Sequence, residues 1–197
     1  MRAAARRPPE TISPMSGHHL ILGECSDFLT GESLQDTLDE RYRQQLARLL
    51  VEGKGFTKSE ISPRVPLRVT AGEKCAQLQI DLAVSLENAI GMIIRFGPGS
   101  LTTRHRPALA ISRLLSPHQI PVVVVTNGQD ADILDGFSGK RIGRGLSEIP
   151  TRMQLAERVA ALKAVPVSPQ RAAIESRVLY AYEVDGSCPC DESVCRL

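Results

Sequence analysis

The sequence predicts a mixed α/β fold in which helices flank a central sheet. Residues 120–126 contain an unbroken run of valines, which is typical of a strand covered on both faces. Residues 37–52 place apolar side chains at spacings of three and four, as an amphipathic helix does. The expected order is one helix, three strands, a second helix and a fourth strand, which fits a sheet covered by helices.

The composition limits what this fold can contain. A chain of 197 residues is long enough for one domain with a core and flanking segments. Because Trp is absent and only 4% of the residues are aromatic, the core must be aliphatic. The net charge of +2 neither demands nor excludes nucleic acid, since a local basic patch matters more than the sum.

The chain shows no signal-peptide pattern, and no run approaches the roughly 20 apolar residues that a membrane helix needs. We therefore expect a cytoplasmic protein without membrane contact. In that compartment the five cysteines are free thiols or metal ligands rather than disulfides.

Three segments are expected along the chain. Residues 1–17 form a disordered arm that is basic and rich in proline. Residues 18–163 form the domain. Its first helix is capped by Thr37 and carries Leu38, Tyr42 and Leu46 at amphipathic spacings. Residues 164–197 hold a linker, a short helix at 175–182 and a cysteine-containing tail.

Within the domain, proline residues bracket an edge-type strand at 65–69. The other expected elements are a hairpin of strands 77–84 and 92–96, a helix at 102–115, the strand at 120–126, a helical turn at 130–134, a hairpin at 137–142 with Gly139 at its tip, and a helix at 151–162.

Five runs of this sequence resemble the N-terminal domain of the R subunit of type I restriction enzymes. They are residues 39–43, 49–58, 79–84, 98–101 and 122–130, so the resemblance covers about residues 39–162. No phosphate loop of the Gly-x-x-x-x-Gly-Lys-Ser/Thr type occurs, so the chain encodes no helicase motor. The similarity is greatest to small stand-alone proteins that carry this domain alone.

The resemblance implies a PD-(D/E)XK nuclease fold with a Mg²⁺ site for phosphodiester hydrolysis. Carried over by position, Glu40 is the acid of the first helix and Asp81 is the acid of the strand. Ile93 stands where the family has a second carboxylate, and Arg95 stands where it has lysine. Two of the four expected site residues therefore depart from the family pattern.

These departures limit the chemistry that the site can perform. Asp81 and Glu40 can still hold one Mg²⁺, which needs one or two carboxylates besides water and phosphate oxygens. Ile93 cannot ligate a metal, which makes a two-metal mechanism improbable. Arg95 can brace a phosphate but stays protonated and cannot act as a general base. Because each lost electrostatic group costs about 10²-fold or more in rate, we expect little or no cleavage.

Each of these residues also has a purely structural interpretation. Asp81 and Arg95 can form a buried salt bridge across the hairpin, which we favour for Arg95. Glu40 can be a simple acid of a first helical turn, which we favour for that residue. A migrated acid can also replace the carboxylate lost at position 93, and the candidates are Glu73 and Glu87.

Basic residues follow the predicted hairpin. Arg104, Arg106 and Arg113 lie in the predicted second helix and, together with Arg95, can line a cleft that binds nucleic-acid phosphates without reading sequence. The alternative is a solvated helix face.

Three cysteines close together mark the tail. Cys188, Cys190 and Cys195 fall within eight residues and can ligate Zn²⁺ if Cys75, Cys25 or a residue of a partner completes the tetrahedron. Their spacing lacks the usual paired form, so a flexible, reactive tail is the plainer alternative.

The sequence thus predicts a family member with a degenerate nuclease site that binds DNA or another nucleic acid. The competing hypotheses are a slow Mg²⁺- or Mn²⁺-dependent DNA endonuclease and a non-enzymatic interaction protein with a Zn²⁺-binding tail. Other protein subunits are conceivable partners of either.

Overall fold

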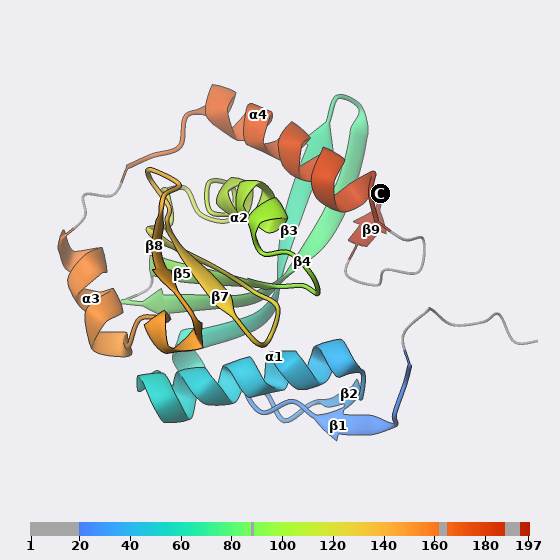
Figure 1. Ribbon diagram of the computed structural model, residues 1–197. Helices are drawn as coiled ribbons and strands as arrows, with labels where there is room; N and C mark the ends of the chain where they lie inside the picture. The colour runs from blue at the N-terminus through green and yellow to red at the C-terminus, as the bar shows by residue number, and fades with distance from the viewer. Residues whose placement is uncertain (1–19, 88, 162–164, 188–193) are drawn as a thin grey trace, which may run out of the picture.

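The computed structural model describes residues 20–87, 89–161, 165–187 and 194–197. The predicted N-terminal arm, Cys188 and Cys190 lie outside these residues. Within them, a mixed sheet of seven strands is flanked by four α-helices, which confirms the predicted α/β class. Figure 1 shows α1 (Leu38–Arg48) below the sheet and α2 (His105–Ile111) and α4 (Pro169–Leu179) above it.

The strand order in the sheet is β3-β4-β5-β6-β7-β8, and β9 lies beside β4. The strands are β3 (Ile61–Ala71), β4 (Lys74–Leu86), β5 (Ala89–Phe96), β6 (Val122–Thr126), β7 (Ala131–Asp135), β8 (Arg141–Arg144) and β9 (Val194–Arg196). The β5–β6 pair is parallel and the other pairs are antiparallel. A separate two-stranded sheet joins β1 (Glu24–Ser26) to β2 (Ser33–Gln35).

Two aliphatic layers cover the two faces of the large sheet. One layer includes side chains of α2 and α4, and the other includes side chains of α1 and α3 (Arg152–Ala161). Every residue of β6 is fully buried between these layers, as its valine run predicts. α4 also packs against β3, so the segment after residue 164 contributes to the same core.

One predicted element was wrong. Residues 130–134 do not form a helical turn, because Ala131–Asp135 is β7, which pairs with β6 along its whole length. The chain reverses at Gly128, whose positive φ of 87° suits a tight turn between these strands. Pairing with the buried β6 outweighs the weak local preference of the segment. The next reversal includes Gly139, where a hairpin turn was expected.

The helices differ from expectation mainly at their ends. Thr37 caps α1 by accepting a hydrogen bond from the backbone N–H of Glu40, as predicted, and a π-helical turn at Leu49–Gly53 continues the helix. The expected helix at 102–115 is shorter, because a 3₁₀ turn at Thr102–Arg104 precedes α2. α4 begins earlier than expected and passes into a π-helical turn at Tyr180–Val184. Further 3₁₀ turns lie at Lys58–Glu60 and Leu146–Glu148.

Strand β4 changes its neighbour along one edge. Residues 82–86 pair with β5, whereas residues 76–78 pair with β9. Residues 79–81 lie between these two ladders, at the point where β5 leaves β4 to run beside β6. We call this point the fork. It contains Asp81 and Arg95, two residues of the predicted site that are hydrogen-bonded to each other.

Candidate functional site

Asp81 lies in the fork between β4 and β5, and its side chain is held by donors on two sides. Its Oδ1 accepts a hydrogen bond from Arg43 Nε at 2.7 Å. Its Oδ2 accepts one from Arg95 Nη1 at 2.8 Å and one from the backbone N–H of Phe96 at 3.0 Å. Asp81 is only 6% exposed. A carboxylate offers about four lone-pair positions, so these donors occupy most of its binding capacity.

Arg95 fills the rest of the fork. Its Nη1 also donates to the backbone carbonyl of Gln79 at 2.9 Å, and its Nη2 donates to Glu183 Oε2 at 2.9 Å. Burial by itself lowers the pKa of the Arg95 guanidinium, but the charges of Asp81 and Glu183 outweigh burial and raise that pKa above its ordinary value. Arg95 is thus a charged side chain that supplies hydrogen bonds where the strand ladder is interrupted.

Glu40 joins the same network from the first turn of α1. The helix spacing places Arg43 and Gln44 three and four residues further on, and both donate to the Glu40 carboxylate, at 3.3 and 2.7 Å. Arg43 therefore bridges Glu40 and Asp81. Glu40 is buried rather than a solvated helix acid. The structure thus brings Glu40, Asp81 and Arg95 together, as the sequence predicts, with Arg43 between the two acids.

Arg64 approaches this network from β3 with an unusual backbone. It lies between the register pairs Pro63–Leu82 and Val65–Ile80, and its φ of +50° is uncommon for a residue with a side chain. Its guanidinium reaches Asp27 at 2.7 Å and Glu40 at 3.9 Å. A left-handed residue inside a strand costs on the order of 1–3 kcal/mol.

Sequence reasoning missed Arg43, Arg64 and Glu183. The position of Arg43, three residues after Glu40, was a usable signal, because side chains at that spacing share a helix face. Arg64 and Glu183 gave no such signal, since their partners lie far away in the sequence.

Position 93 lies in an aliphatic layer of the core and carries no group that could ligate a metal. Ile93 pairs with Ala83 across the hairpin, is 0% exposed and packs in the layer beneath α2 and α4. The two candidates for a migrated acid lie in the turns at opposite ends of β4. Glu73 is eight residues from Asp81 and Glu87 is six, which is about 26 and 20 Å of strand. None of these three positions supplies a carboxylate beside Asp81.

The other predicted arginines separate into different places. Arg106 and Arg113 meet at Glu175 of α4, which they contact at 2.5 and 3.0 Å. Arg104 donates to the backbone carbonyl of Pro98 at 3.0 Å. Arg95 is engaged in the fork. Sequence reasoning did not identify Glu175, which is fully buried, nor Arg171, which contacts it at 2.6 Å.

The tail reaches the sheet through β9, where Cys195 lies opposite Gln77 of β4. Cys75 lies on β4 and Cys25 on β1. Among the described residues, no group of three or more His, Cys, Asp or Glu side chains is arranged to hold a metal ion. Because Cys188 and Cys190 fall outside those residues, Zn²⁺ binding by the tail stays a prediction.

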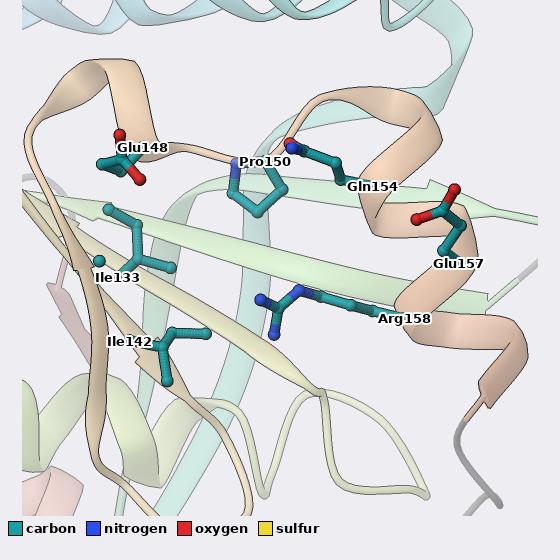
Figure 2. A pocket seen from close by; sticks show the side chains of 8 residues that line it. Ile133, Ile142, Glu148, Pro150, Gln154, Glu157 and Arg158 are labelled. Carbon is teal, nitrogen blue, oxygen red and sulfur yellow. The ribbon is translucent and has the colours of Figure 1, made fainter.

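A hollow of 260 Å³ opens elsewhere, between the β7–β8 hairpin and α3 (Figure 2). The Arg158 side chain extends from α3 toward Ile133 and Ile142, while Glu148 and Glu157 stand at the edges. The lining thus mixes one cation, two acids and apolar groups, which indicates no single ligand chemistry.

The comparison with protein families gives one match, to the type I restriction enzyme R protein N terminus, over residues 38–150. The match covers more than half of the chain, from the first residue of α1 to a point just before α3. The chain belongs to this family. Neither curated proteins nor solved structures give a match.

The matched region of this R-protein N-terminal family member contains Glu40, Asp81 and Arg95. The two acids that contact its arginines from the C-terminal segment, Glu175 and Glu183, lie beyond the matched region. No helix among the described residues of this family member is long and apolar enough to cross a membrane.

Proposed function

We propose that this R-protein N-terminal family member binds DNA, and that its PD-(D/E)XK-like metal site has become a structural ion-pair network that cleaves DNA slowly or not at all. The observation that carries the loss of cleavage is the set of three donors on the Asp81 carboxylate. Membership of a restriction-enzyme family supports DNA as the ligand and other subunits as partners.

The network opposes a bound cation for an electrostatic reason. A Mg²⁺ ion takes oxygen ligands at about 2.1 Å and keeps several waters. To reach Asp81 it must displace the guanidiniums of Arg43 and Arg95, which would then be buried beside a divalent cation. Removing one partner from a buried pair costs about 3–5 kcal/mol, so the residues present do not fit a metal in their observed arrangement.

One observation favours the competing endonuclease function. Glu40 and Asp81, the two acids that would hold Mg²⁺, remain close enough to share Arg43. If Arg43 moves out when DNA arrives, its departure frees one oxygen of each carboxylate, Oδ1 of Asp81 and Oε2 of Glu40, for a metal.

Calorimetric titration with Mg²⁺ and Mn²⁺ distinguishes the two functions. We expect no metal binding by the wild type or by Asp81→Asn, and no Mn²⁺-dependent nicking of plasmid DNA. The control is Asp130→Asn, which removes a carboxylate that pairs with Arg144 on the surface. Metal binding and nicking that are lost in Asp81→Asn but kept in Asp130→Asn would establish the endonuclease instead.

DNA binding is tested on the same samples by titration with a duplex at several salt concentrations. For each phosphate that the protein neutralises, the logarithm of the binding constant falls by about 0.9 for every tenfold rise in salt concentration. We expect such a slope for the wild type and for Asp81→Asn. Absence of binding at low salt would refute the proposed function.

A further inference from the structure

Helix α4 lies over α2 (Figure 1). Three arginines from this region surround a single buried acid. Glu175 of α4 is 0% exposed. Its Oε1 accepts from Arg113 at 3.0 Å and from Arg171 at 2.6 Å, and its Oε2 lies 2.5 Å from Arg106 Nη1. Arg106 belongs to α2, Arg113 follows that helix, and Arg171 precedes Glu175 by one helical turn on α4. We call these four residues the Glu175 cluster.

The Glu175 cluster carries two more positive charges than negative ones. Among the described residues, the salt bridges of Arg106, Arg113 and Arg171 all lead to Glu175. Burial lowers the pKa of the Arg113 guanidinium, Glu175 opposes this, and the nearby Arg171 and Arg106 lower it further, so the net direction is downward. The cluster is therefore short of negative charge, and an added anion would relieve the repulsion.

Part of the surplus charge is exposed to solvent. The Arg171 side chain is 52% exposed and that of Arg106 is 38% exposed, whereas Arg113 is mostly buried. Their ion pairs with Glu175 hold the exposed guanidiniums near one another before any ligand arrives, which lowers the entropy lost on binding. The first turn of α4 contains no acid, so its helix dipole adds to the positive potential.

We propose that the Glu175 cluster binds a phosphate group and, resting on the proposed function, that this group belongs to the backbone of DNA. Arg106 and Arg171 contact the phosphate oxygens, for which the planar guanidinium is well suited. Arg113 contributes charge from behind, and Glu175 is the positioning residue that keeps the arginines together. Contacts of this kind fix the DNA without reading its sequence.

The double variant Arg106→Gln/Arg171→Gln tests the site. It leaves Glu175 paired with the buried Arg113, so the fold retains the contact between α4 and the end of α2. The matched control is Arg177→Gln, an exposed arginine of α4 whose guanidinium donates to the carbonyl of Ala173 in its own helix. Arg171→Gln alone provides a milder second variant if the double variant fails to fold.

Fluorescence anisotropy with two labelled duplexes of unrelated sequence gives the affinities. We expect the double variant to bind both duplexes roughly tenfold or more weakly, with a salt slope smaller by about one for each phosphate that it no longer neutralises. Arg177→Gln should bind like the wild type. An unchanged affinity and slope in the double variant would overturn this inference while leaving the proposed function intact.

A second arm separates the site from the proposed function. Sodium phosphate, compared with sodium chloride at equal ionic strength, should raise the Tm of the wild type and of Arg177→Gln but not that of the double variant. If the wild type fails to bind DNA, the proposed function fails, and this phosphate effect alone would still support the anion site. Equal Tm values in the two salts for the wild type would then refute the site as well.

Discussion

Asp81 and Glu175 are both buried carboxylates that contact arginines, yet their surroundings differ in charge. Around Asp81, the acids that are buried or half-buried nearly balance the arginines. Their salt bridges join Asp27, Glu40, Asp81 and Glu183 to Arg43, Arg64 and Arg95, and the exposed Glu32 adds a contact to Arg64 at 3.5 Å. We call this set the Asp81 network. In the Glu175 cluster, one acid faces three arginines.

The pKa directions of two arginines show the effect of this difference. Burial lowers the pKa of both Arg95 and Arg113. For Arg95 the two nearby acids, Asp81 and Glu183, reverse the direction, whereas for Arg113 the neighbouring arginines reinforce it. A balanced network joins strands and leaves little capacity for a ligand. An unbalanced one holds the helices together and retains an attraction for anions.

The largest expected effect comes from adding an acid next to the balanced network. Ile93→Glu places a carboxylate in an aliphatic layer, opposite Ala83, without a partner. We expect a loss of about 5 kcal/mol or more in the free energy of unfolding, measured with urea, because the buried charge is unpaired. Ile142→Glu on the exposed β8 should change it little. A folded Ile93→Glu that binds Mn²⁺ would show that this position does face the site.

Removing the central acid of the Asp81 network should have the next largest effect. Asp81→Ala leaves Arg43 and Arg95 without their shared partner and the backbone N–H of Phe96 without its acceptor. We expect urea unfolding to show a loss of about 3–5 kcal/mol. Asp130→Ala, which disrupts a surface pair, should lose much less. Similar losses in both variants would mean that the network contributes little to stability.

Neutralising Glu175 sharpens the comparison, because only the unbalanced region should respond to anions. Glu175→Gln leaves three arginines together without an acid, and we expect a loss of about 3 kcal/mol. Phosphate should restore part of the lost Tm at constant ionic strength. Asp81→Asn is the matched variant in the balanced region, and phosphate should not restore the Tm that this variant loses. Equal recovery of both variants would contradict the distinction.

The smallest expected effect is the acid sensitivity of Asp27. Burial raises the pKa of its carboxyl. Hydrogen bonds from the backbone N–H groups of Thr30 and Leu29 and the ion pair with Arg64 outweigh burial and hold that pKa below its ordinary value. The stability it contributes is therefore complete above the unfolded pKa of about 3.9 and disappears as the pH falls through the lower folded pKa.

The wild type should consequently exceed Asp27→Asn in unfolding free energy by a constant amount near neutral pH. Urea unfolding at a series of pH values should show this difference shrinking only below about pH 4. A difference that stays constant down to about pH 2, or that grows as the pH falls, would mean that the Asp27 pKa is not lowered.

Much of the fold could be predicted because its signals are local. The Thr37 cap, the period of α1, the valine run of β6 and the turn at Gly139 each depend on neighbours within a few residues, and each agrees with the structure. The prediction for the β7 segment was wrong because its five residues show no clear hydrophobic periodicity. The segment is a strand because it pairs with β6. Such pairing lies outside any local window.

The candidate site divides in the same way. The sequence was sufficient to identify the family and the absence of a carboxylate at position 93. It also offered the pair of Asp81 with Arg95 as one of two interpretations, and the structure contains that pair. Only the tertiary structure decided that Glu183 meets Arg95 across 88 residues and that Glu175 meets Arg113 across 62. Charges interact strongly only within a few ångströms. The sequence therefore reveals which side chains are charged, but the packing of α4 and of the π-helical turn after it decides which of them meet.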